Sequence, residues 1–320
     1  MNETGCLVIS LDFELYWGMR DKQDLELYRE NLMGVKKAIN EMLHLFLESD
    51  IHATWATVGF LFYENKEQLL KAFPPQTPDY NNKKLSPYGY IESQKVLDEQ
   101  FHFASGLIKK IHESRGQEVA THTYSHYYCL ESGQRLEEFR EDLLSAVAVA
   151  RTFGIDTESL VFPRNQWNQE YLGILSDVGI KTYRGNQDHW IYKAVEEENN
   201  NNFVRAMRLA DTYINISGHN TYSWPNALDE LTNVPASRFL RPYSKRFRHF
   251  EGLRLKRIKN SMTHAAKRNE VFHLWWHPHN FGANTEQNIS TLNEILTHYR
   301  YLRDEYGMQS LSMAEFAGDL

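Results

Sequence analysis

Short apolar runs alternate with helix-like segments through most of the chain, and this rhythm limits the possible folds more than any other feature. Residues 7–11, 53–59 and 271–276 are short, mainly apolar runs with β-branched and aromatic residues, as expected of buried parallel strands. Between the first two runs, the apolar residues of 31–48 recur every three to four positions, which is typical of an amphipathic helix. Strands that alternate with helices predict βα units and therefore a parallel sheet or barrel.

Two segments interrupt this rhythm and bear on the domain organisation. Residues 74–90 contain four of the nine prolines, and residues 196–202 are three glutamates followed by four asparagines. A chain of 320 residues allows two domains of about 150 residues, or one α/β barrel of about 250 residues with insertions. We expect one domain over 1–320, with insertions at about 74–102 and 191–270.

Charge and cysteine content exclude several classes of protein. The net charge of −7 argues against a surface built to bind nucleic acid. Two cysteines, Cys6 and Cys129, are too few for a disulfide scaffold and suit a reducing compartment. The sequence has no basic and then apolar leader, and no apolar run approaches the 18 or so residues of a membrane span. We therefore expect a cytoplasmic protein, either free or peripheral to a membrane.

Two histidines four residues apart follow one of the predicted strands. His122 and His126 come directly after residues 118–121, at the strand end where α/β folds place their sites. If this segment is the first turn of a helix, both imidazoles lie on one face and can bind one metal ion. Since the chain has 14 histidines, such a pair also arises by chance, and its position after a strand carries the argument.

Two carboxylates end the first predicted strand. Asp12 and Glu14 are two residues apart, so the alternation of a strand puts both on the same side. A helix cap or a surface acid pair would explain them equally well if they stood alone. Together with two histidines at another strand end, however, they match a divalent metal site with a free carboxylate as base.

Two more strand ends carry residues suited to catalysis. Arg164 follows the apolar residues 160–162 and could hold a carboxylate through paired hydrogen bonds, which would keep its pKa low. His277 follows the strand 271–276 and could protonate a leaving group. A structural histidine beside tryptophan is the plain alternative for His277.

In this order, the motifs resemble the polysaccharide deacetylase family, also called carbohydrate esterase family 4 or the NodB-homology group. The resemblance covers about residues 5–282. It implies a distorted (β/α) barrel of about seven parallel strands, and metal-dependent removal of N- or O-linked acetyl groups from a sugar or glycan precursor. The motifs that carry it are Asp12-Phe13-Glu14, Ala53-Thr54-Trp55, His122-Thr123-Tyr124-Ser125-His126, Phe162-Pro163-Arg164 and Trp276-His277-Pro278.

The resemblance also implies catalytic roles. Asp12 resembles the general base, Arg164 the residue that steers it, and His277 the general acid. The chain departs from the common pattern of adjacent acids, because Phe13 separates Asp12 from Glu14. By analogy Glu14 is the third metal ligand, and the reverse assignment, with Asp12 as the ligand, stays open.

The remaining implied roles concern the metal and its surroundings. His122 and His126 resemble two ligands of a divalent metal, with zinc as the first choice and cobalt, nickel or manganese as alternatives. Asp188 is expected to support His277. Trp167 and Trp276 are expected to contact the substrate or the catalytic groups.

The same residues leave alternatives open for the function and for the partner. A hydrolase of a non-sugar amide or cyclic imide on the same barrel, or a catalytically silent carbohydrate-binding protein, would compete with the deacetylase. The expected substrate is an acetylated sugar that is linked to a nucleotide or lipid, or a glycan precursor. Segment 236–270 has eleven basic and two acidic residues, and this net +9 could contact a pyrophosphate, an anionic membrane or only solvent. The sequence does not predict the oligomeric state.

Overall fold

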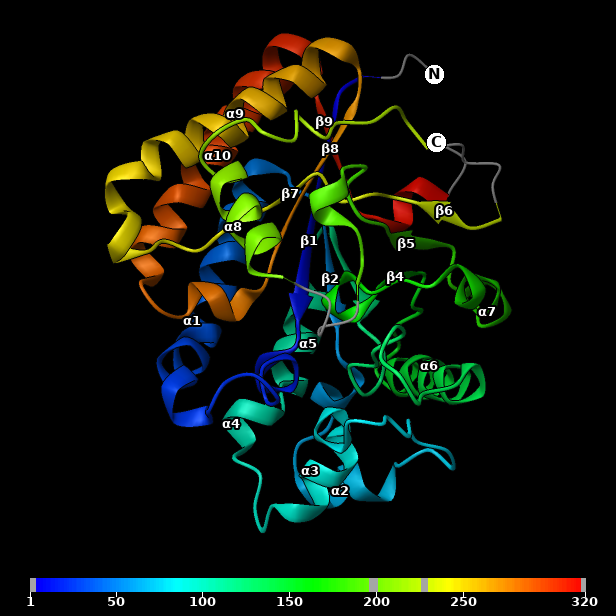
Figure 1. Cartoon of the computed structure of the whole chain (residues 1–320). Coiled ribbons are helices and arrows are strands. Elements are labelled where there is room, and N and C mark those ends of the chain that lie inside the picture. The colour runs from blue at the N-terminus through cyan, green and yellow to red at the C-terminus, as the bar shows by residue number, and fades with distance from the viewer. Residues whose placement is uncertain (1–3, 196–200, 226–229, 318–320) are drawn as a thin grey trace.

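The computed structural model describes residues 4–195, 201–225 and 230–317, and a parallel sheet forms its centre (Figure 1). The strand order is β6-β5-β4-β3-β2-β1-β8-β7. Strand β9 pairs with the first residues of β1, and β2 pairs with the later residues of β1. All these strand pairs are parallel. The strands are β1 (Cys6–Phe13), β2 (Ala53–Thr57), β3 (Gln117–Thr121), β4 (Ser159–Val161), β5 (Thr182–Arg184), β6 (Thr232–Asn233), β7 (Arg238–Phe239), β8 (Val271–Trp276) and β9 (Gln309–Leu311).

Helices cover the outside of the sheet. In Figure 1, α1, α9 and α10 lie on one side of the central strand β1, and α6 and α7 lie on the other. Helix α1 begins after Asp24, whose carboxylate accepts the backbone N–H of Glu26, and it ends at Asp50 in a left-handed conformation. The helices are α1 (Leu25–Ser49), α2 (Lys66–Lys71), α3 (Pro87–Ser93), α4 (Glu99–His102), α5 (Ser105–His112), α6 (Leu136–Arg151), α7 (Leu172–Asp177), α8 (Asn202–Asp211), α9 (Glu251–Arg268) and α10 (Thr285–Tyr306).

The alternation of β1 decides which residues face the inside of the barrel. Leu7, Ile9 and the other odd-numbered residues of β1 pack in the large core beneath the helices. Cys6 and Val8 belong instead to a smaller cluster with apolar residues of β2, β3 and β4. Because side chains along a strand alternate between its two faces, Asp12 shares the inner face with Val8. The strand therefore delivers an acid to the interior of the barrel at its carboxyl end.

These observations confirm the predicted distorted (β/α) barrel. The described residues form nine strands rather than about seven, because β6 and β7 are two-residue strands without an apolar run of their own. Both come from segment 191–270, which also supplies α8 and α9. Of the polar segment 196–202, residues 196–200 lie outside the described residues, and the assignment of 1–320 to one domain stays a prediction.

Within the described part of the chain, no helix combines the length and the apolar character that crossing a bilayer requires.

Candidate active site

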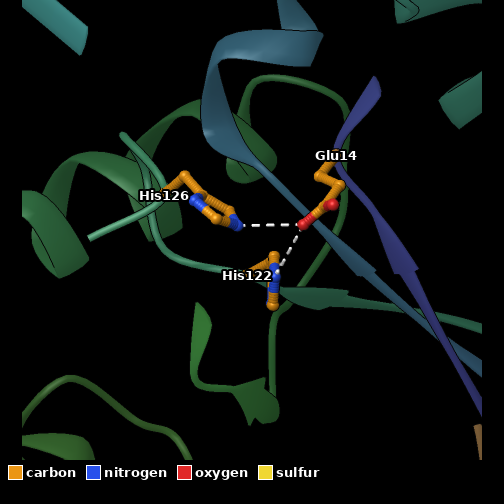
Figure 2. Close-up of side chains that lie close together, drawn as sticks. All are labelled: Glu14, His122 and His126. Carbon is orange, nitrogen blue, oxygen red and sulfur yellow. Dashed lines mark hydrogen bonds and ion pairs between the residues drawn. The ribbon is translucent and has the colours of Figure 1, made fainter. Parts of the chain in front are cut away.

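Glu14 lies directly after β1, at the centre of a cluster of histidines. Its Oε2 atom lies 2.9 Å from Nε2 of His126 and 3.4 Å from Nε2 of His122 (Figure 2). One ligand atom from each of the three residues lies within 4.8 Å of the other two. Gly18 packs against the same carboxylate, and a Cβ at this position would overlap the Glu14 side chain. Glycine at position 18 thus leaves room for the carboxylate.

The loop that carries both histidines is not a helix, so the prediction of a first helical turn is wrong. Residues 122–128 have no regular secondary structure, and Thr123 and His126 have left-handed φ values of 62° and 60°. The backbone N–H of Tyr127 donates to Thr123 Oγ1 at 2.7 Å, a bond that a helix would not make. These turns bring the two imidazole centroids to 5.0 Å from each other. For a β-branched threonine a positive φ is strained, and such strain occurs mainly at functional sites.

A buried carboxylate on α6 holds this loop in place. Asp142 accepts the backbone N–H groups of Tyr124 at 2.7 Å and Ser125 at 3.1 Å, as well as the Ser125 hydroxyl. Burial raises the pKa of Asp142 to about 7, against the effect of these hydrogen bonds. The loop is therefore fixed from outside the site by a residue whose hydrogen bonds go to neither histidine.

Hydrogen bonds to Nδ1 leave Nε2 of each histidine directed at Glu14. His122 Nδ1 lies 2.7 Å from the carbonyl of Val161 at the end of β4, and His126 Nδ1 lies 3.1 Å from the Tyr128 hydroxyl. Burial lowers the pKa of His126 to about 4, which keeps its imidazole neutral and able to bind a metal. His122 Nε2 is buried without a hydrogen-bond partner among the described residues. Such an orphaned nitrogen beside a carboxylate fits a metal-binding site.

Asp12 is held by Arg184, the last residue of β5. The two guanidinium nitrogens of Arg184 donate to the two Asp12 oxygens at 2.7 Å and 2.8 Å. The same nitrogens donate to Ser10 Oγ at 2.9 Å and to Asn165 Oδ1 at 2.8 Å, and the guanidinium lies 4.2 Å from the Trp275 ring centroid. Burial opposes ionisation of Asp12, but Arg184 lowers its pKa below the usual value.

The expected pairing of Arg164 with Asp12 is therefore wrong. Arg164 is part of a left-handed turn after β4, with φ of 57°. Its guanidinium pairs with Asp21 and Glu131 and lies 4.0 Å from the Tyr128 ring centroid. In the sequence Arg184 also stands near the end of a predicted strand, directly after Thr182 and Tyr183.

His277 faces both carboxylates. Its Nε2 lies 3.7 Å from Asp12 Oδ2 and 3.6 Å from Glu14 Oε1, and its side chain is 22% exposed. Burial would raise the pKa of Glu14, but the histidines around it hold that pKa well below the usual value. His279, which follows directly after the Trp276-His277-Pro278 motif and to which we assigned no role, is a fourth histidine here, with Nε2 3.9 Å from Glu14 Oε1. Burial lowers its pKa to about 3.

Three predicted site residues lie away from this group. Trp276 is fully buried in the helix-side core, where it stacks on Phe281, and its neighbour Trp275 is the one that contacts Arg184. Trp167 is half-buried against a satellite core. Asp188 is exposed, and the described carboxylates within ion-pair distance of His277 are those of Asp12 and Glu14. Neighbouring side chains of β8 point to opposite faces of the sheet, so Trp275 and not Trp276 reaches the site.

Comparison with known structures agrees with the barrel fold. A protein of Mycobacterium smegmatis assigned as a polysaccharide deacetylase has a TM-score of 0.62 and 12% identity, over 99% of this chain and 90% of that one. A GH57-type branching enzyme of Pyrococcus horikoshii has a TM-score of 0.55 and 12% identity, over 98% and 69%. Puue allantoinase has a TM-score of 0.54 and 11% identity, over 98% and 88%. At these identities the likeness concerns the fold.

Part of the sequence also matches a known family. Residues 32–183 match the family model of polysaccharide deacetylase. The match includes the loop with both histidines, whereas Asp12, Glu14 and His277 lie outside it and join the site through β1 and β8. A comparison with curated proteins found no match.

Proposed function

We propose that this chain is a metal-dependent deacetylase that hydrolyses the acetyl group of an acetylated sugar. One observation carries the proposal: Glu14 lies between Nε2 of His122 and Nε2 of His126 on one side and His277 on the other. The match of residues 32–183 to the polysaccharide deacetylase family model supports deacetylation as the reaction. The pair of Asp12 and His277 beside this cluster supplies a base and an acid.

The residues fit a divalent metal. Glu14, His122 and His126 would hold it, and the orphaned Nε2 of His122 would gain a partner. Asp12 is the weaker candidate for a ligand, because both of its oxygens accept hydrogen bonds from Arg184. A bound divalent metal would polarise the acetyl carbonyl and lower the pKa of a water molecule. One carboxylate and two imidazoles form a donor set that zinc accepts, and cobalt, nickel and manganese are the alternatives.

Asp12 and His277 move the protons in the proposed reaction. Asp12, kept ionised by Arg184, takes a proton from the water that attacks the acetyl carbon. His277, which is partly exposed and so accessible to a sugar, gives its Nε2 proton to the leaving nitrogen or oxygen. The bond from the acetyl carbon to that atom breaks, and acetate and the free amine or alcohol leave. Asp12 has then gained one proton and His277 has lost one, and exchange with solvent restores both.

A metal-binding experiment tests the first half of the proposal. The metal-stripped chain, incubated with zinc and then dialysed, should hold about one zinc per chain by mass spectrometry of the metal, and zinc should raise its melting temperature. His126→Gln should lose most of the metal and the rise in melting temperature. His44→Gln, which changes an exposed histidine on α1, is the matched control and should retain both. A wild-type chain that binds none of zinc, cobalt, nickel and manganese would contradict the proposal.

Acetate release tests the second half. Zinc-loaded chain is incubated with N-acetylglucosamine, its oligomers, a nucleotide-linked N-acetyl sugar and an O-acetylated oligosaccharide, with allantoin as the non-sugar amide. Asp12→Asn and His277→Gln should lower the rate by about 10²–10⁴ while the metal stays bound. Asp304→Asn, at an exposed acid on α10, should keep the wild-type rate. Hydrolysis of allantoin alone would assign a non-sugar amidase, and no hydrolysis by a metal-loaded chain would favour a silent binding protein.

A further inference from the structure

A cavity of about 220 Å³ lies next to the acid and base. Trp275 and Asn165 line it, and both contact Arg184, the residue that holds Asp12. Phe239 lines it as well, and its ring centroid lies 5.9 Å from that of His277. The cavity and the catalytic group therefore share these neighbours, and a sugar bound at His277 lies close to the cavity. Its volume is below the range of about 300–1,000 Å³ typical of drug-sized ligands, so it fits one small group or sugar ring rather than a polymer.

The described residues that line the cavity include five basic side chains and no acidic one. Two of these cations are neutralised by carboxylates in the protein: Arg164 pairs with Asp21 and Glu131, and Arg238 pairs with Asp211. A further one, Arg208, donates its Nε proton to a backbone carbonyl. Arg241 and Lys193 complete the set. Arg241 and Lys193 are therefore lining cations without an ion pair to a described carboxylate.

Arg241 is the cation whose surroundings point most directly to a ligand. Its Nε donates to Thr212 Oγ1 at 3.1 Å, whereas its two terminal nitrogens donate to no described residue. No carboxylate of the described residues lies within 4 Å of its guanidinium, in contrast to Arg238 of the same segment. Burial lowers the pKa of Arg241, which means that the protein around it disfavours the cation. A half-buried guanidinium in this state gains an ion pair if an anion enters the cavity.

We propose that the substrate sugar carries an anionic group, either phosphate or carboxylate, and that Arg241 binds this group in the cavity. Lys193, which lines the same cavity, adds a second positive charge. Aromatic walls at Phe239 and Trp275 suit the faces of a sugar ring. The assignment of the anion to a substrate rests on the proposed deacetylase function, but the anion site itself does not.

The buried parts of the basic segment favour a small anion over a membrane. Arg254 and Arg257 of α9 are buried and pair with Glu251 and Asp211, so neither is available to lipid. Arg241 instead lines a cavity together with Phe239 and Trp275, and this concave setting suits a ligand that enters from solution. Binding of the chain to anionic vesicles is the competing outcome.

Calorimetry on metal-free chain tests the anion site without any activity, because phosphate then has no metal to bind. Inorganic phosphate and glucuronate serve as probes for the phosphate and the carboxylate. At least one should bind, and Arg241→Gln should weaken that binding at least tenfold, as expected for loss of a charged hydrogen bond. Arg246→Gln, which removes an exposed arginine of the same segment, is the matched control and should bind as the wild type does. Arg241→Lys, which keeps the charge and loses the paired donors, should fall between them.

Kinetics on the zinc-loaded chain then connect the site to the substrate. The ratio of kcat/KM for N-acetylglucosamine 1-phosphate or an N-acetylated aminouronic acid over that for neutral N-acetylglucosamine should exceed one. In Arg241→Gln this ratio should fall at least tenfold, mainly through KM. The preferred probe, phosphate or carboxylate, identifies the anionic group.

The possible outcomes separate the two proposals. Arg241-dependent anion binding with no hydrolysis of any acetylated sugar overturns the deacetylase and leaves the anion site. Acetate release without Arg241-dependent binding overturns the anion site alone. Vesicles with anionic lipid that bind the wild type and Arg241→Gln equally, with no binding of either small anion, would also overturn it in favour of a membrane surface.

Discussion

Replacing Asp211 by asparagine should show how much the buried ion pairs beside the cavity contribute to stability. Asp211 ends α8 and is fully buried. Its carboxylate lies 3.1 Å from a nitrogen of Arg238 in β7 and 3.3 Å from a nitrogen of Arg257 in α9. It also accepts the backbone N–H groups of Ile216 and Ser217 at 2.9 Å and 2.8 Å. One residue thus joins a helix, a strand and a second helix around segment 202–257.

The expected loss of stability follows from the charged groups that the substitution leaves without a partner. The asparagine side chain would keep one carbonyl oxygen for the two backbone N–H groups, but the negative charge would be lost. Arg238 and Arg257 would then remain buried without their carboxylate partner, since each is only 4–5% exposed and pairs with Asp211. Removal of one partner from a buried ion pair costs about 3–5 kcal/mol, so we expect Asp211→Asn to lower the free energy of unfolding by about 3 kcal/mol. That is a large part of the roughly 5–15 kcal/mol typical of a folded domain.

The same residue predicts a dependence on pH. Burial opposes ionisation of Asp211, but Arg238 and the hydrogen bonds from Ser217 lower its pKa below the usual value. A carboxylate with a lower pKa in the folded state stabilises the fold above the unfolded pKa of about 4, and this stabilisation is lost as the pH falls through the folded pKa. The difference between wild type and variant should therefore be full between about pH 5 and 8 and should shrink below about pH 4.

Equilibrium urea unfolding, followed by tryptophan fluorescence at about pH 7 and again near pH 3, measures both effects. Asp304→Asn, which breaks an exposed pair with Arg303, is the control and should change the free energy of unfolding by less than about 0.5 kcal/mol. A loss below about 1 kcal/mol for Asp211→Asn would refute the reasoning. So would a loss that is the same at both pH values.

Two further predictions concern the catalytic group. Arg184→Met should raise the pKa of Asp12 and shift the acid limb of the pH profile of kcat/KM upward by about one pH unit or more. Arg184→Lys should shift this limb less. If the limb does not move in soluble, folded Arg184→Met, the pairing of Arg184 with Asp12 is contradicted. Gly18→Ala should displace the Glu14 carboxylate and lower zinc binding about tenfold or more in a competition assay with a coloured chelator. Gly252→Ala, where a methyl group would meet no atom within 4 Å, should bind zinc as the wild type does, and equal binding by both variants would refute the steric argument.

The sequence predicted the barrel because its long strands leave a signal in the apolar pattern. Each of β1, β2 and β8 is a run of five or more residues that is almost entirely buried, so the run is visible without knowledge of its neighbours. Strands β6 and β7 contain two residues each and include Asn233 and Arg238. Their pairing depends on neighbouring strands that already stand in the sheet, and this is a tertiary effect that a local pattern does not carry.

The sequence did not show which of two arginines near strand ends pairs with Asp12. Arg164 lies three residues after the end of β4, whereas Arg184 is the last residue of β5. Arg184 belongs to its strand and points into the barrel, where Ser10 and Asp12 of β1 accept its protons. Arg164 lies beyond the buried run, in a left-handed turn, and reaches Asp21 instead. Position within the strand, rather than proximity to its end, would have been the better criterion.

Asp142 was also visible in the sequence, and the reason it matters is physical. Phe139, Leu143 and Ala146 form the buried stripe of α6, and Asp142 lies within that stripe with no exposed surface. A carboxylate on the apolar face of a helix needs hydrogen-bond donors, because an isolated buried charge is costly. The donors here are the backbone N–H groups of the loop between His122 and His126. An acid placed in an apolar stripe therefore predicts that a segment with unpaired hydrogen-bond donors packs against it, and here those donors belong to the loop that carries both histidines.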